Sequence, residues 1–326
     1  AQERMPAPEI HEACADHSMM LWQQMRGTCA VANARSDAVP SIRANMGTGT
    51  LLAYLGLEQE FPPGQMPWLR KHMSVEEAAA CTVDDIQFQG TFARALEFIA
   101  FAREILDNRI DIFCLDTQGP FDLAHLLLGD QIFYLMMDDP SLMHRIMELC
   151  TTLYIRCTEA VKKSTGEPNG ECVHGCRLYV PNAGIRICED TTTLIGRAAM
   201  EEFALPYTLR AAAAFGGAWI HFCGRCDELR DAVCECEDVR GVNYGIVPSK
   251  EDDFDFDEEI RTLSRHGKVY YGNIPRCAGE TGADYLRRLH DYAETGSLLA
   301  FGDPALRGEN GFANAGDALE FWYGLG

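Results

Sequence analysis

The sequence predicts an α/β protein, more closely a TIM (β/α)8 barrel with an N-terminal helical extension, from two observations. From about residue 86 onward, short apolar runs typical of buried strands alternate with longer amphipathic stretches typical of crossover helices. The length of 326 residues suits one barrel with lengthened loops, and a hydrophobic content of 47% supplies a large core. We therefore expect a helical cover over residues 1–38 and one barrel domain over residues 39–326.

Apolar runs give the expected positions of the strands. Each run is followed by Gly, Asp, Asn or Pro and then by a helical pattern, as expected of strand–loop–helix units. The expected strands are residues 110–115, 185–188, 218–223, 239–244, 268–272 and 298–301.

Helical patterns are clearest in two places. Residues 12–34 have helical character, and Val39-Pro40 marks the end of this segment. A longer helix is expected to begin after Asp139, whose side chain caps free N–H groups, with Pro140 in the first turn. It should end near Lys163, before Gly166.

The charge balance restricts the partners. The chain carries 49 acidic and 28 basic side chains, a net charge of −21 that repels phosphate backbones and anionic lipid surfaces. Neither nucleic acid nor a membrane is therefore expected as a partner. The sequence also has no apolar stretch of bilayer length and no signal-peptide pattern, so a cytoplasmic location is expected. In that compartment the 14 cysteines are expected to stay reduced.

Polar residues at the carboxyl ends of the expected strands are the candidates for catalysis, because barrel enzymes place their sites there. We assign this role to Asp116, Asp190 and Asn243. Asp116 and Asp190 are equally well explained as helix caps. The other polar residues at strand ends are Gln118, Glu189, His221, Cys223, Asn273 and Asp303.

The motif His221-Phe222-Cys223 predicts a metal site. Side chains two residues apart in a strand point to the same face, so the imidazole and the thiolate can converge on one ion. Zinc favours this nitrogen and sulfur pair. The motif alone also fits a buried pair without metal, but its place at a strand end, before Gly224 and a helix from Asp227, favours a site. Cys226 is a candidate further ligand, although its place at the helix start directs it away from the barrel axis.

Two other cysteine clusters are weaker candidates. Cys172, His174 and Cys176 lie in a segment rich in Gly and Pro, which is typical of a loop. Cys234 and Cys236 lie in a helical pattern, where side chains two residues apart diverge.

With these segments, the chain resembles the uroporphyrinogen decarboxylase superfamily, and within it the corrinoid-dependent methyltransferases of the methylcobamide:coenzyme M methyltransferase type. The resemblance runs from about Val39 to the C-terminus. The matching stretches are Asp116-Thr117-Gln118-Gly119-Pro120-Phe121, the helix after Asp139-Pro140, Glu202-Phe203-Ala204-Leu205-Pro206-Tyr207, His221-Phe222-Cys223-Gly224 and Gly272-Asn273-Ile274.

The resemblance implies a TIM barrel in which His221 and Cys223 bind zinc. In the methyltransferase branch a further cysteine near the last strand supplies another ligand, and here Asp303 takes its place. The decarboxylases carry an arginine-rich N-terminal motif that grips substrate carboxylates, and the segment 40–47 does not reproduce it.

The function expected from the resemblance is zinc-dependent transfer of a methyl group between a corrinoid and a small thiol or other small molecule. Because the barrel pattern uses nearly the whole chain, the corrinoid is expected on a partner protein. One alternative is a metal-independent decarboxylase of uroporphyrinogen or another polycarboxylate. A second is a binding protein that carries a small ligand without catalysis.

Overall fold

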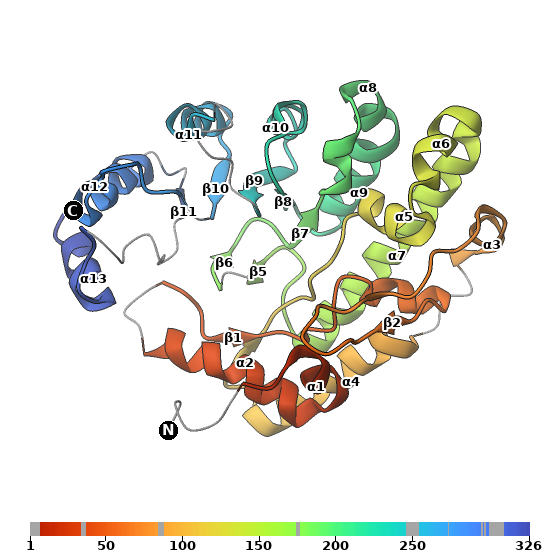
Figure 1. Ribbon diagram of the computed structural model, residues 1–326, viewed down its shortest axis with the longest axis horizontal. Helices are drawn as coiled ribbons and strands as arrows, with labels where there is room; N and C mark the ends of the chain where they lie inside the picture. The colour runs from red at the N-terminus through yellow and green to blue at the C-terminus, as the bar shows by residue number, and fades with distance from the viewer. Residues whose placement is uncertain are drawn as a thin grey trace.

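Figure 1 shows the computed structural model of the chain, with the strands towards the middle and the helices arranged around them. The structure describes residues 7–33, 37–83, 88–173, 177–245, 254–272, 274–294, 296, 298–299 and 310–326. The predicted Asn273 and Asp303, together with His174 and Cys176, lie outside the described residues.

A parallel five-stranded sheet forms the centre of the fold. Its strands are arranged in the order β11-β10-β9-β8-β7, and every neighbouring pair is parallel. The strands are β7 (Ile185–Cys188), β8 (Ala218–Phe222), β9 (Val239–Tyr244), β10 (Val269–Tyr271) and β11 (Leu298–Leu299). These positions confirm five of the expected strands, with ends that differ by no more than about two residues, the usual uncertainty of a strand end.

Two further strands continue this succession on the β7 side. Strand β1 (Ser41–Ile42) pairs in parallel with β4 (Asp111–Ile112), the remaining expected strand. The chain after β4 then reaches β7, where Gln118 forms a parallel bridge with Cys188 and the Gly119 N–H donates to the Cys188 carbonyl at 2.8 Å. The α/β class is thus confirmed. Within the described residues these are seven parallel strands and no closed ring, so the eight-stranded barrel stays a prediction.

Helices connect the central strands and cover their outer side (Figure 1). This alternation is the one that the sequence pattern predicted, because parallel neighbours need a crossover segment between them. The crossover helices are α9 (Leu205–Ala214), α10 (Asp227–Cys234), α11 (Phe256–Arg265) and α12 (Gly282–Ala293).

Strand β8 shows how the sheet separates its two faces. Ala218, Ile220 and Phe222 are fully buried and belong to the large apolar core that includes the helices. The alternate residues Trp219 and His221 face the other side, where Trp219 packs with Tyr271 in a smaller cluster. The second face therefore carries the candidate site.

The remaining elements surround this framework. Besides short pieces, they include the 26-residue helix α7, which Asp139 caps by accepting the Leu142 N–H at 3.0 Å and which ends at Gly166, as predicted. These elements are α1 (Ile10–Ala15), α2 (His17–Ala32), η1 (Thr50–Leu55), β2 (Gln59–Glu60), β3 (Trp68–Leu69), α3 (Val75–Ala80), α4 (Gly90–Leu106), α5 (Pro120–Leu128), α6 (Gln131–Asp138), α7 (Pro140–Thr165), β5 (Cys172–Val173), β6 (Tyr179–Val180), η3 (Thr191–Leu194), α8 (Arg197–Ala199), η4 (Met200–Ala204) and α13 (Ala315–Tyr323).

The N-terminal segment differs from the expectation in one respect. Two helices, α1 and α2, replace the single expected helix, because Asp16 has an extended backbone and accepts the N–H groups of Ser18 and Met19. Helix α2 lies beside β1, and Thr28 donates to the Ser41 carbonyl at 2.7 Å. The domain boundary near residue 38 stays a prediction. In the described part of the chain, no helix is long and apolar enough to cross a membrane.

Candidate functional site

The end of β8 brings His221 and Cys223 to one point. A Cβ atom built on Gly245 would lie 2.9 Å from the His221 Nε2 and 2.6 Å from the Cys223 Sγ, so both atoms pack against this glycine of the neighbouring chain segment. The two donors therefore share one face, as the alternation of side chains in a strand requires. The ligand role that we predict for this pair needs such a convergence.

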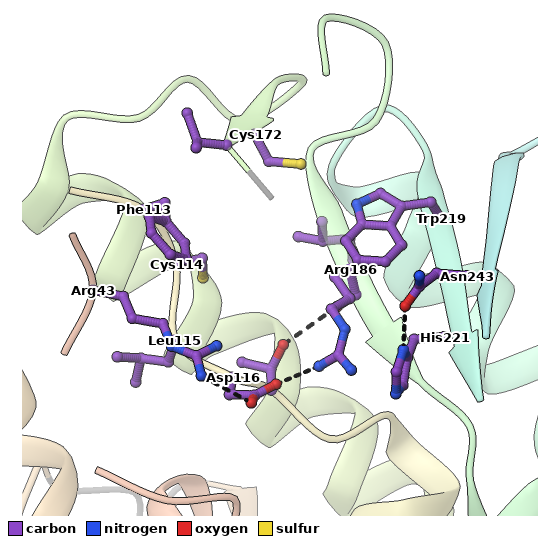
Figure 2. A pocket seen from close by; sticks show the side chains of 13 residues that line it. Arg43, Phe113, Cys114, Leu115, Asp116, Cys172, Arg186, Trp219, His221 and Asn243 are labelled. Carbon is purple, nitrogen blue, oxygen red and sulfur yellow. Dashed lines mark hydrogen bonds and ion pairs between the residues drawn. The ribbon is translucent and has the colours of Figure 1, made fainter. Parts of the chain in front are cut away.

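Asn243 fixes which nitrogen of His221 faces the site. The Asn243 Nδ2 donates to the Tyr271 carbonyl, which leaves its Oδ1 to contact the His221 Nδ1 at 2.5 Å (Figure 2). Since the amide oxygen only accepts, the proton must be on Nδ1, and Nε2 keeps its lone pair. This arrangement is the usual way in which a protein prepares a histidine to bind a metal. We predicted Asn243 as catalytic, whereas its contacts are those of a positioning residue.

The neighbouring strand β7 adds two more donor groups. Cys188 is paired with His221 in the strand register, and Asp190 follows two residues later. One ligand atom from each of Cys188, Asp190 and His221 lies within 4.8 Å of the others. Cys188-Glu189-Asp190 thus repeats the spacing of His221-Phe222-Cys223 on the adjacent strand. This spacing was the available signal for Cys188, which was expected only as the end of the strand over residues 185–188.

Asp190 connects the two strand ends. Its Oδ1 accepts the backbone N–H of Cys223 at 2.7 Å, and its Oδ2 accepts the thiol of Cys188 at 3.3 Å. It precedes the short helix η3, but its side chain makes no capping bond there. The carboxylate therefore faces the site rather than a helix end.

The other predicted metal ligands are differently placed. Cys226 is the N-cap residue of α10, its side chain makes no capping hydrogen bond, and burial raises the pKa of its thiol. Asp303 lies outside the described residues. Cys234 is buried at the end of α10, and Cys172 belongs to the small cluster around Trp219.

A cavity of about 230 Å³ adjoins His221 on the inner face of the strands. Figure 2 shows the guanidinium groups of Arg43 and Arg186 converging on the carboxylate of Asp116. Arg186 also lies 5.8 Å from the ring of Trp219, and Asn243 borders the same cavity. Asp116, predicted as a catalytic residue or a helix cap, is thus an ion-pair partner. Neither arginine was anticipated as a site residue.

The charges around this cavity determine the protonation of its residues. Burial alone would raise the pKa of Asp116, but Arg43 and Arg186 together lower it, so the carboxylate is ionised at neutral pH. Burial lowers the pKa of His221, and the charge of Arg186 lowers it further. A neutral imidazole is the form that binds a metal.

Two carboxylates lie behind the site. Asp122 of α5 is 2% exposed and Glu189 is 1% exposed. Glu189 accepts hydrogen bonds from Thr208, at 2.5 Å, and from Thr192. Its side chain therefore points away from the group formed by Cys188, Asp190 and His221. Burial raises the pKa of Glu189 to about 8 and that of Asp122 to about 6. Glu189 was considered a polar strand-end residue, but its side chain belongs to the buried layer beneath.

Comparison with known sequences finds a family that is similar to part of the chain. The uroporphyrinogen decarboxylase family matches residues 28–167. This match covers somewhat less than half of the 326 residues and shows a similarity of that region to the family. The matched region includes β1, β4 and α7 and ends before β7, so the strands that carry Cys188 and His221 lie outside it. No curated protein matches the chain.

Solved structures give an independent view of the fold. A methyltransferase from Methanosarcina mazei superposes with a TM-score of 0.63 over 97% of this chain and 86% of its own. The two sequences are 14% identical. This likeness shows that the chain shares its fold with that protein across almost its whole length.

Proposed function

We propose that this chain is a zinc-dependent methyltransferase that moves a methyl group between a corrinoid carried by a partner protein and a small thiol or other small molecule. The observation that carries the proposal is the His221 imidazole, which Asn243 contacts at Nδ1. A ligand atom of His221 lies within 4.8 Å of those of Cys188 and Asp190, and its Nε2 packs with the Cys223 Sγ against Gly245. The similarity of residues 28–167 to the uroporphyrinogen decarboxylase family and the fold shared with the Methanosarcina mazei methyltransferase support it.

The donor set fits zinc. One imidazole nitrogen, two thiols and a carboxylate are the ligand types that zinc accepts, and a tetrahedral catalytic site uses three of them and leaves one position open. We assign His221 and Cys223 as ligands and Asp190 as the third, with Cys188, Cys226 and Asp303 as the competing candidates. When bound, zinc lowers the pKa of a substrate thiol, so that the thiolate is available at neutral pH.

The protein's own residues prepare the site for this chemistry. Asn243 keeps the proton of His221 on Nδ1, and Asp190 fixes the backbone of Cys223 through its N–H group. The substrate is accommodated in the adjoining cavity, where Arg43 and Arg186 share a single carboxylate, Asp116. Two guanidinium groups and one carboxylate leave one positive charge, which favours a substrate with an anionic group.

The arginines also favour a second candidate, a metal-independent decarboxylase of uroporphyrinogen or another polycarboxylate. Both guanidinium groups are already paired with Asp116, however, which reduces their ability to hold several carboxylates. The cavity of about 230 Å³ is also below the range of roughly 300–1,000 Å³ that is usual for drug-sized ligands. A tetrapyrrole is larger than such ligands, so the size of the cavity favours a small methyl acceptor or donor.

Metal analysis and a methyl-transfer assay together test the proposal. Purified protein is expected to contain about one zinc per chain, and His221→Ala and Cys223→Ala are each expected to lose it. Cys236→Ser, at a thiol that follows α10 and donates to the Ala232 carbonyl of that helix at 3.2 Å, is the matched control and should retain zinc. With methylcobalamin or a methylated corrinoid protein and small thiols, the zinc-loaded protein should accelerate loss of the methyl–cobalt absorption. Methylated substrates with reduced corrinoid test the reverse direction.

Two results would contradict the proposal. Full zinc content in both His221→Ala and Cys223→Ala would exclude the metal site. Release of carbon dioxide from uroporphyrinogen by metal-free protein, without methyl transfer in either direction, would replace the proposal by the decarboxylase.

A further inference from the structure

Asp122 is a buried carboxylate that the proposed chemistry does not use. It lies in the first turn of α5, and its side chain reaches the chain segment that follows β7. Its Oδ2 accepts the N–H of Asp190 at 3.1 Å, and its Oδ1 accepts the N–H of Thr191 at 2.7 Å. Both carboxylate oxygens are therefore used to hold the backbone of two consecutive residues.

The start of α5 is itself fixed against β7. The Gly119 N–H donates to the Cys188 carbonyl, and a Cβ atom on Gly119 would lie only 2.4 Å from that carbonyl oxygen. Such a contact excludes any side chain at position 119. Asp122, three residues later, is thus held at a defined distance from the end of β7.

The contacts of Asp122 continue to the candidate ligands. Asp122 holds the N–H of Asp190, whose carboxylate in turn holds the N–H of Cys223 and the thiol of Cys188. A shift of Asp122 would therefore be transmitted to both strand ends, since each link in this series is a hydrogen bond to a buried or half-buried group.

We infer that Asp122 is a positioning residue, which orients Asp190 and through it the donor group formed by Cys188, Asp190, His221 and Cys223. The metal-binding part of this inference rests on the proposed function, whereas the link from Asp122 to the Cys223 backbone does not. A purely structural role, in which Asp122 only ties α5 to η3, would affect stability alone.

The test compares Asp122→Asn with Thr208→Val. Asparagine keeps the shape of Asp122 but replaces one accepting oxygen by an N–H donor, so one of its two backbone hydrogen bonds is lost. Thr208→Val removes a hydrogen bond to Glu189 in the same buried region without touching Asp190. Both variants are expected to lower the melting temperature. Asp122→Ser, which keeps one acceptor, replaces Asp122→Asn if that variant does not fold.

Two readouts separate positioning from stability. In metal-free protein, amide hydrogen exchange at Cys223 should become roughly tenfold faster in Asp122→Asn and should not change in Thr208→Val. Zinc affinity, measured by competition with a chelator, should fall about 10- to 100-fold in Asp122→Asn, and the visible spectrum of the cobalt-substituted protein should shift.

Failure of this inference can be distinguished from failure of the proposed function. If Asp122→Asn loses stability but retains the exchange rate at Cys223, the positioning role is wrong whether or not the protein binds metal. If the wild-type protein binds no zinc while exchange at Cys223 still accelerates, the proposed function fails and the positioning of Cys223 by Asp122 stands.

Discussion

Asn243 shows what a single residue contributes and how far sequence reasoning reaches. Its place at the end of an expected strand was sufficient to predict that it faces the site. Its role depends on a contact 28 residues away, the Tyr271 carbonyl that orients its amide, and on His221 in the neighbouring strand. No local pattern encodes such contacts, so the sequence indicated the residue but not what it does.

Replacement of Asn243 tests its role. Asn243→Leu removes the acceptor that keeps the His221 proton on Nδ1, so zinc affinity is expected to fall about 10- to 100-fold. Asn243→Asp retains an acceptor and should retain most of the affinity. Asn314→Ala removes a helix cap that accepts the Asp317 N–H at 3.0 Å, far along the chain, and serves as the control that loses stability only. Equal zinc affinity in Asn243→Leu and wild-type protein would rule out the positioning of His221.

The identity of the third zinc ligand is a second prediction for a single residue. Asp190→Ala should weaken zinc binding by roughly tenfold or more, because its carboxylate lies within 4.8 Å of the donor atoms of Cys188 and His221. Cys226→Ser should retain the affinity, since Cys226 lies at the N-cap of α10, beyond the end of β8. The zinc affinity of Asp303→Ala is measured in the same way. Loss of zinc in Cys226→Ser or Asp303→Ala, with full binding in Asp190→Ala, would identify a different ligand set.

At the scale of elements, strand register determines the site. The spacing of His221 and Cys223 predicted that both face one way, because alternation along a strand is a local property. That Cys188 stands opposite His221 depends on how β7 pairs with β8, and the sequence contains no direct signal for this pairing. Cys188 was therefore expected only as the last residue of a strand. The break between α1 and α2 was missed for the opposite reason, because a local cap at Asp16 interrupts an otherwise helical pattern.

Gly245 provides a prediction for the packing of these elements. A methyl group at this position would lie 2.6 Å from the Cys223 Sγ and from the His221 Cε1, so Gly245→Ala must displace both candidate ligands. Zinc affinity is expected to fall by at least about tenfold. Gly196→Ala is the matched control, because nothing lies within 4 Å of a Cβ atom there. Unchanged zinc binding in Gly245→Ala would show that the two side chains do not share one ion.

At the scale of the whole molecule, the α/β class followed from the alternation of apolar runs and helical patterns. Closure of a barrel is a different kind of property, because it depends on the pairing of the first and last strands rather than on any one segment. The buried layer behind the site likewise depends on contacts between distant segments of the chain. Asp122 and Glu189 come from α5 and from the segment after β7, and only the folded chain brings them together in a region without solvent.

This buried layer predicts how the stability of the protein depends on pH. Burial raises the pKa of Glu189 to about 8, whereas the unfolded chain has a value of about 4.3. Between these values the folded state binds more protons than the unfolded state. The contribution of Glu189 to the free energy of unfolding is therefore fully present below the unfolded pKa and is lost as pH rises through about 8. Asp122, with a pKa of about 6, acts in the same direction over the lower part of the range.

Glu189→Gln isolates this contribution. The amide stays neutral at every pH, and the hydroxyl groups of Thr192 and Thr208 can both donate and accept, so the local hydrogen bonds can be kept. The free energy of unfolding of metal-free protein should therefore decline more steeply between pH 5 and pH 8 in the wild type than in Glu189→Gln. Urea titrations across this range measure both curves. Parallel curves would mean that Glu189 is already ionised in the folded protein, and that burial does not hold a proton in the layer beneath the strand ends.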